Sequence, residues 1–549
     1  MALAPLSPDP KDTVVVAVNH EHAAETKARA EAAAVARSGE AVLRDDPEAR
    51  AAFLASFSAA DEKRIMRKVD RRFLLLIGLM YMVKQIDVTN AASVKVLQVG
   101  QPSNILKELH MTPDQYNWVQ SIYYISYIIF ETPSNLILKR MSPHVWQSRI
   151  FFTWGIVLAC HAAIQNRQGY YAVRFILGMM EAGFFPGVMC QMAFWYRTEE
   201  YGKPVMWLFA ISQAAGVVGS LLCYGISYMD GIRGLSAWRW VYLLEGLATI
   251  LFSVSIYFLL PDYPKSPRSD RWLTKREQEF IETRLSENAP LTSDPAFSSK
   301  EIWASLKNPN LWSFMGMQMF VNLANYGLTW YLPTITTSLG FAKLPKNQLL
   351  NIPPAVSASL GVVGSYWFIR GAYISRPLWI SILMLCEVVC FILFFTISNH
   401  VGIYIACILG TMFGQAFFIN FWAWRSSTLK GSTGTAFVLG FQNCVGQVGG
   451  VVAPQYFVQK WAYNRYKNSF AIATSFLITA FFFAQWTWWL TRNVEADVLR
   501  VARLRKAAKK EGRVYAEDDI KVFEERKYDS AFWSIKKFRR SNGVARPEV

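Results

Sequence analysis

Twelve apolar segments, each long enough to cross a lipid bilayer as a helix, dominate this sequence. A membrane-spanning helix needs about 20 mostly apolar residues. Such segments lie at residues 73–95, 116–138, 148–166, 169–195, 203–228, 239–260, 310–338, 347–369, 375–397, 400–424, 433–458 and 468–491. Only helices and closed barrels satisfy every backbone group in hydrocarbon, so the pattern predicts an all-α membrane protein with twelve transmembrane helices.

The twelve segments fall into two sets of six, separated by a polar and charged stretch. We therefore divide the chain into a disordered N-terminal tail (1–72), an N-terminal six-helix half (73–260), a central loop (261–309), a C-terminal six-helix half (310–491) and a C-terminal tail (492–549). Two halves of nearly equal length are typical of duplicated carriers, whose substrate site lies between the halves.

The net charge of +17 comes mostly from Lys and Arg in the tails and in loops beside the apolar segments. This placement is typical of the cytoplasmic side of membrane proteins, and it argues against a nucleic-acid partner. A basic run between Lys63 and Arg72 directly precedes the first segment. We therefore expect both termini and the central loop to be cytoplasmic, with no signal peptide.

Several kinds of chemistry have no sequence signature in this chain. Its seven cysteines are scattered through apolar segments without a CxxC pair, so neither disulfides nor a metal site is predicted. The chain also has no Gly-x-x-x-x-Gly-Lys-Ser/Thr loop for ATP. We therefore expect a protein that is not an enzyme and that uses no cofactor.

The first apolar segment carries polar side chains where hydrocarbon should be. Lys84, Asp87 and Asn90 follow one another at three-residue spacing, and a charge at the centre of a membrane helix costs roughly 2.5–3.5 kcal/mol on insertion scales. Lys84 and Asp87 are placed to form an ion pair. Such a pair fits either a structural contact with neighbouring helices or a substrate and proton site that faces a watery cavity.

The fourth segment contains Arg174 and Glu181, which are seven residues apart and so lie on one helix face. The guanidinium of an Arg is always charged and suits a carboxylate, whereas a Glu in a poorly hydrated cavity can carry a proton. We predict that Lys84, Asn90 and Arg174 bind substrate, and that Asp87 and Glu181 carry protons. The alternative for Arg174 and Glu181 is a structural role between helices.

Five strings resemble the anion:cation symporter family of the major facilitator superfamily. They are KQIDVTN (84–90), QYNWVQSIYYISYIIFETPSNLILKR (115–140), RFILGMMEAGFFPGV (174–188), WRWVYLLEG (238–246) and NYGLTWYLPTI (325–335). The first string is similar to that of the fungal allantoate, pantothenate and vitamin H permeases. The resemblance implies the twelve-helix fold, proton-coupled uptake and an organic-anion substrate. Many members carry Arg directly after the first-helix Asp, where this chain has Val88, and we expect Lys84 to supply that charge.

Polar residues of the seventh and eleventh segments complete the predicted site. Gly327 and Pro333 loosen the seventh helix, where Asn325 and Tyr326 are candidate substrate-binding residues, and Gln442 of the eleventh is another. Membrane anchoring of Tyr326 and helix packing through Gln442 are the alternatives.

Together these features predict a secondary transporter in the plasma membrane that works as a monomer. We expect it to import a small organic anion with protons by alternating access. The anion would be a carboxylate such as a nicotinate-like or pantothenate-like vitamin, or an allantoate-like ureide. The alternatives are an exporter of an acidic metabolite and a nutrient receptor that does not transport.

Overall fold

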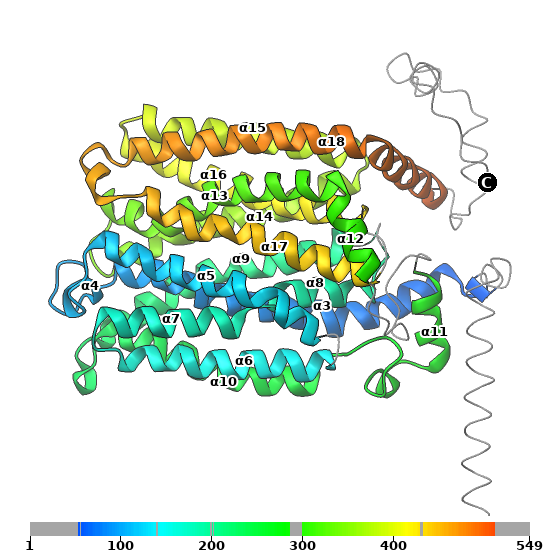
Figure 1. Ribbon diagram of the computed structural model, residues 1–549, viewed down its shortest axis with the longest axis horizontal. Helices are drawn as coiled ribbons and strands as arrows, with labels where there is room; N and C mark the ends of the chain where they lie inside the picture. The colour runs from blue at the N-terminus through cyan, green and yellow to red at the C-terminus, as the bar shows by residue number, and fades with distance from the viewer. Residues whose placement is uncertain are drawn as a thin grey trace, which may run out of the picture.

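The structure is a computed structural model that describes residues 53–54, 56–138, 141–197, 200, 202–285, 299–428 and 432–510. The rest of the predicted tails, and residues 286–298 of the central loop, lie outside the described residues. The described residues form helices and turns without a β-strand. The helices pack as two bundles, one above the other in Figure 1, so the all-α prediction is confirmed.

Six membrane-length helical spans form each half. The N-terminal half contains α3 (Ala59–Lys95), α5 (Pro113–Leu138), α6 (Pro143–Cys160), α7 (Arg167–Glu181) with α8 (Phe184–Ala193), α9 (Gly202–Ile226) and α10 (Ala237–Leu259). The C-terminal half contains α13 (Pro309–Ser338), α14 (Ile352–Arg370), α15 (Arg376–Thr396), α16 (His400–Ser426), α17 (Ser432–Tyr456) and α18 (Lys467–Lys510).

Short helices connect these spans. They are α4 (Ile105–Glu108), α11 (Lys275–Thr283) and α12 (Ser299–Lys307), together with the 3₁₀ turns His161–Ala163, Ser227–Met229, Ile232–Gly234, Ser269–Arg271, Lys346–Asn351 and Gln459–Asn464. Helix α3 begins and α18 ends at the same end of the bundle, beside α11 and α12 (Figure 1). We call this the terminal end and the opposite one the far end.

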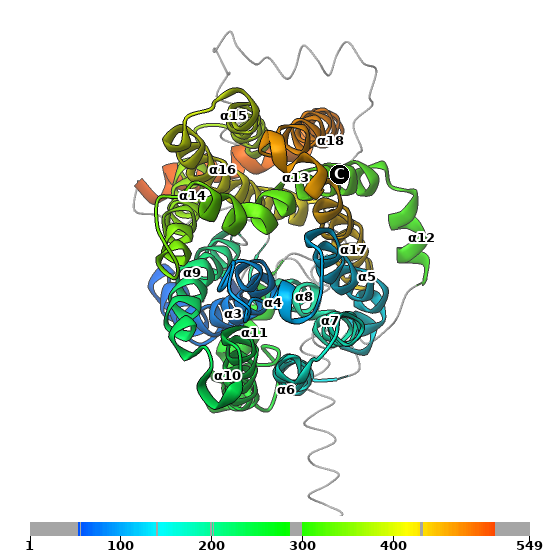
Figure 2. The same ribbon diagram turned by 90° about the vertical axis from the view of Figure 1, so that its left-hand side faces the viewer.

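The boundary between the halves is formed mainly by two helix pairs, α5 with α17 and α9 with α14. Viewed along the helices, these pairs lie on opposite sides of the bundle (Figure 2). In each pair the second span of one half packs on the fifth span of the other. The halves are therefore related by an approximate two-fold arrangement, as expected for a duplicated carrier.

Within the described residues, eight helical segments are long and apolar enough to cross a membrane. The other four spans, α5, α6, α13 and α17, carry more polar side chains. Of these four, α17 packs on α5 across the boundary between the halves and on α13 within the C-terminal half. Polar groups there can hydrogen-bond across helices instead of facing lipid.

Three helix boundaries do not coincide with those of the predicted apolar segments. Helix α3 begins at Ala59 rather than at residue 73, because Ser58 and Asp61 form a capping box. Helix α18 continues to Lys510, so residues 492–510 of the predicted tail are helical. The fourth span is broken after Glu181, because Gly183 adopts a left-handed φ of 88°.

The central loop is attached to the N-terminal half by ion pairs at the terminal end. Lys68 of α3 donates to Glu277 of α11 at 2.7 Å, and Arg284 donates to Glu62 at 2.9 Å. Partial burial raises the pKa of the Glu277 carboxyl, but the hydrogen bond from Lys68 acts in the opposite direction. The pKa of Glu277 is lowered as a result. These contacts hold α11 against the start of α3.

Gly449 of α17 lets this helix pass close to α13. A Cβ at Gly449 would lie 2.6 Å from the backbone carbon of Asn322 and 2.8 Å from its Cβ. Backbone atoms cannot move aside as a flexible side chain can, so the close approach requires glycine. Gly364 of α14 is a matched contrast, because its Cβ would meet nothing within 4 Å.

We expect Gly449→Ala to destabilise the fold by about 1–3 kcal/mol through overpacking. Gly364→Ala should be neutral or slightly stabilising, because Ala is the better helix former. Thermal unfolding of both variants in detergent measures the difference. An unchanged melting temperature for Gly449→Ala would contradict the close packing of α13 and α17.

Candidate functional site

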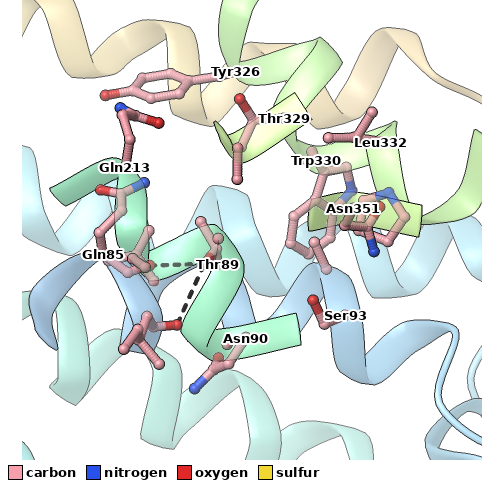
Figure 3. Close-up of a pocket in the computed structure, with 18 of the residues that line it drawn as sticks. Gln85, Thr89, Asn90, Ser93, Gln213, Tyr326, Thr329, Trp330, Leu332 and Asn351 are labelled. Carbon is pink, nitrogen blue, oxygen red and sulfur yellow. Dashed lines mark hydrogen bonds between the residues drawn. The ribbon is translucent and has the colours of Figure 1, made fainter. Parts of the chain in front are cut away.

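A cavity of about 160 Å³ lies between the two halves, with side chains of both halves in its wall. An apolar cavity of about 150 Å³ can admit benzene, so this one has room for a small organic molecule. Its polar lining includes Gln85, Thr89, Asn90, Ser93, Gln213 and Glu245 from the N-terminal half, and Asn322, Asn325, Tyr326, Thr329, Asn351 and Gln415 from the C-terminal half. Figure 3 shows residues of α3 facing Tyr326, Thr329 and Trp330 of α13.

The lining contains many polar side chains but carries little charge. Glu245 is the only carboxyl among the described residues that line the cavity, and none of them is Lys, Arg or His. Amides, hydroxyls and the rings of Trp330, Tyr326 and Phe418 make up most of the wall. A bound molecule would therefore meet hydrogen-bonding groups and aromatic faces before any basic group.

Asn90 connects the cavity wall to a buried cation. Its Oδ1 accepts a hydrogen bond from Arg174 Nη2 at 3.1 Å, and its Nδ2 donates to Glu245 Oε2 at 2.8 Å. Arg174 is fully buried and also donates to the hydroxyl of Tyr242 at 2.8 Å. Arg174 therefore lies behind Asn90 and outside the lining, linked to Glu245 through one amide.

Lys84 forms its ion pair with Glu181, at 3.4 Å between Nζ and Oε1. Both side chains are buried, and Lys84 also lies 5.7 Å from the ring centre of Tyr127. Neither residue lines the cavity, whereas Val88 does. The expectation that Lys84 supplies the charge missing at position 88 therefore lacks geometric support in this structure.

The predicted ion pair between Lys84 and Asp87 is wrong. Asp87 Oδ2 instead accepts hydrogen bonds from Trp154 Nε1 at 2.7 Å and from Thr249 Oγ1 at 3.1 Å. Three residues turn a helix by about 300°, which leaves the two side chains about 60° apart. Lys84 thus reaches α7, while Asp87 faces α6 and α10.

The remaining predicted residues separate into two groups. Asn325 and Tyr326 line the cavity, and the Tyr326 hydroxyl donates to Gln447 Oε1 at 2.7 Å. Gln442 is fully buried and donates to Gln318 Oε1 at 3.0 Å, away from the cavity lining. Its contact is of the helix-packing kind that the sequence left open as an alternative.

Three buried carboxyl side chains were missed in the sequence, namely Glu131, Glu245 and Glu387. Each is an isolated acidic residue within an apolar span, and an ionisable residue at that depth is itself a signal of function. Glu131 accepts a hydrogen bond from Asn443 across the two halves. Neither oxygen of Glu387 has a hydrogen-bond partner among the described residues.

The two halves touch on both sides of the cavity. Toward the far end, Trp330 Nε1 donates to Asn117 Oδ1 at 3.0 Å, and the backbone of Gln459 donates to Asp114 at 2.8 Å. Toward the terminal end, the rings of Phe185 and Trp422 lie 5.3 Å apart. A molecule in the cavity would therefore have contacts between the halves above and below it.

Comparison with known sequences decides the family. The sequence model of the Major Facilitator Superfamily matches residues 87–454, more than half of the chain. The chain belongs to the Major Facilitator Superfamily. It is thus a multi-pass membrane transporter with a small-molecule substrate and not an enzyme, as the sequence predicted.

Individual members of the superfamily show the range of similarity. The MFS transporter prlL of a fungal species is 31% identical over 54% of this chain and 59% of its own length, so the match spans less than two thirds of that relative. The high-affinity nicotinic acid transporter of Saccharomyces cerevisiae is 26% identical over 77% of this chain and 76% of its own.

A solved structure shows the same fold at low identity. A bacterial homologue of the human lysosomal transporter Spinster, in an inward-facing and occupied conformation, is similar with a TM-score of 0.55 at 14% identity. The similarity covers 75% of this chain and 96% of that one.

Mutation can test whether Glu181 is the ion-pair partner of Lys84. We expect Lys84→Met to lower the free energy of unfolding by about 3–5 kcal/mol, because Glu181 is left as an uncompensated buried charge. Lys84→Met combined with Glu181→Gln should regain most of this loss. Thermal unfolding in detergent provides the measurement.

The matched control combines Lys84→Met with Asp87→Asn. Asp87 has its own donors in Trp154 and Thr249, so this double variant should remain as unstable as Lys84→Met alone. Rescue by Asp87→Asn and not by Glu181→Gln would show that the pairing is the reverse of the one observed.

Proposed function

We propose that this chain is a proton-coupled transporter that imports a small organic anion. The observation that carries the proposal is the cavity between the halves, lined by many amides and hydroxyls, with the buried cation of Arg174 one amide behind its wall. A relative named as a nicotinic acid transporter, similar over 77% of the chain, supports a small organic acid as substrate. The strings quoted above further favour the fungal permease group of the anion:cation symporters.

The cavity wall suits a small acid that contains a planar or amide-bearing part. Its amides and hydroxyls can donate to and accept from such a molecule, and Trp330 and Tyr326 offer aromatic faces. Arg174 can attract the carboxylate through Asn90, because charge acts strongly where water is excluded. These features favour nicotinate-like or pantothenate-like monocarboxylates and allantoate-like ureides.

Alternating access then requires the contacts on the two sides of the cavity to open in turn. Opening the far end would separate Trp330 from Asn117, and opening the terminal end would separate Phe185 from Trp422. Rocking of one half against the other about the α5–α17 and α9–α14 pairs fits this requirement.

Asp87 and Glu181 remain the proton carriers proposed from the sequence. Each is a buried carboxyl of the N-terminal half, outside the cavity lining. Each has partners that a moving helix could exchange, namely Trp154 and Thr249 for Asp87 and Lys84 for Glu181. We place the transporter in the plasma membrane, acting as a monomer with both termini in the cytoplasm. Export of an acidic metabolite and a receptor without transport are the alternatives.

We expect cells of a permease-deficient host that express the chain to accumulate a radiolabelled acid. A panel of nicotinate, pantothenate, allantoate and tartrate samples the class. Uptake should rise as external pH falls and collapse with a protonophore, because the proton gradient supplies the energy. Uptake that follows sodium instead would reject the proton as coupling ion.

Transport direction separates the alternatives. Sealed vesicles should load the acid when the outer side is acidified, whereas an exporter would load only inverted vesicles. Expression without uptake of any acid above the background of empty cells would favour the receptor.

The role of Glu181 can be tested apart from substrate binding. Glu181→Gln keeps size and polarity but removes the titratable group. Exchange of preloaded substrate should therefore persist, whereas accumulation against a gradient should be lost. Arg174→Ala should abolish both activities, because the anion loses its cation. If Glu181→Gln loses both activities equally, the proposed division of labour is wrong.

A further inference from the structure

We propose that Glu245 is the residue at which the proton and the substrate anion are coupled, because its carboxylate and that of the substrate compete for Arg174. The anion then binds only after Glu245 has taken up a proton. The inference rests on the proposed transport of an organic anion. Asp87 and Glu181 then pass on the same proton, and Glu245 is the group whose protonation lets the anion bind.

Glu245 lies where both a proton and the substrate anion can approach it from the cavity. It lies on α10, lines the cavity and is 6% exposed. Its Oε2 accepts from Asn90, while its buried Oε1 has no hydrogen-bond partner among the described residues. One oxygen is therefore linked to Arg174 through Asn90, and the other is free to hold a proton.

The coupling follows from the balance of charge, because the single positive charge of Arg174 balances one carboxylate at a time. Arg174 contributes one positive charge to this network, which an ionised Glu245 balances through Asn90. A substrate carboxylate in the cavity would bring a second negative charge beside the first. Because like charges repel strongly in a poorly hydrated site, the anion is accommodated once Glu245 is neutral.

The groups around Glu245 support this assignment of the proton. The helices and turns packed against α10 present Asp87 from α3, Cys223 from α9 and His161 from the turn after α6. Asp87 already receives hydrogen bonds from Trp154 and Thr249, and the ring centres of His161 and Tyr242 lie 4.7 Å apart. Lys84 is engaged by Glu181. Among the described residues that line the cavity, Glu245 is the carboxyl, and one of its oxygens has no hydrogen-bond partner.

The cycle that follows is electroneutral for a monocarboxylate. One proton binds Glu245 and one anion enters, so that Arg174 exchanges a protein carboxylate for a substrate carboxylate. When the cavity opens to the cytoplasm, both leave and Glu245 rebinds Arg174 through Asn90. No net charge crosses the membrane in a turnover at this site.

Infrared spectroscopy of the purified full chain in lipid nanodiscs tests the proton without a substrate. We expect a carboxylic-acid C=O band that titrates with pH, is absent in Glu245→Gln and is retained in Glu387→Gln, a buried carboxyl outside the cavity lining. A titrating band that is unchanged in Glu245→Gln would overturn the proposal. Should Glu245→Gln fail to fold, Glu245→Asp must shift the band, and an unshifted band would overturn it equally.

Uptake of the same acid panel tests the coupling. Where wild-type uptake rises about tenfold per pH unit, as for one required proton, Glu245→Gln should transport with less than about a twofold change over the same range. Full pH dependence in Glu245→Gln would overturn the proposal while leaving the transport function intact. If wild-type cells take up none of the acids, the proposed function fails, and the infrared result alone decides whether Glu245 binds a proton.

Discussion

A charge inside a membrane bundle must be balanced nearby, and the interior of this transporter is arranged around that constraint. Lys84 is balanced by Glu181, and Arg376 at the start of α15 is balanced by Glu495 at 2.6 Å. Arg174 differs, because its balance runs through the amide of Asn90 to a carboxyl in the cavity wall. It is therefore the charge whose partner a substrate can most readily replace.

The need to balance the charge of Arg174 also makes the site depend on the fold. Asn90 can bridge Arg174 and Glu245 only because α3, α7 and α10 meet within the N-terminal half, while Asn325, Tyr326 and Trp330 approach from α13 of the other half. The basic network thus belongs to one half, and the facing wall to the other. A relative movement of the halves would change the wall while leaving the charge network whole, as alternating access requires.

Much of the fold could be predicted from the sequence, because apolar length and the bilayer thickness determine where helices form. The helix ends were less predictable, since the start of α3 depends on a capping box and the break after Glu181 on the left-handed Gly183. Asn90, Asn325 and Tyr326, predicted as substrate-binding residues, all line the cavity, whereas the partner of Lys84 is Glu181 and not the predicted Asp87. Spacing along one helix gives directions around its axis, whereas the choice between Asp87 and Glu181 depends on how α7 packs. Glu245 was overlooked, although its isolation in an apolar span was visible.

We propose that a small acid binds between Asn90 and Asn325 with its carboxylate directed toward Arg174. A cryo-electron microscopy map of the full chain in a nanodisc, saturated with the acid that gives the strongest uptake, tests it most directly. We expect density for the acid in the cavity between α3 and α13, with Glu245 no longer balancing Arg174 through Asn90. Density outside this cavity, or an acid bound with the Arg174–Asn90–Glu245 hydrogen bonds unchanged, would contradict it.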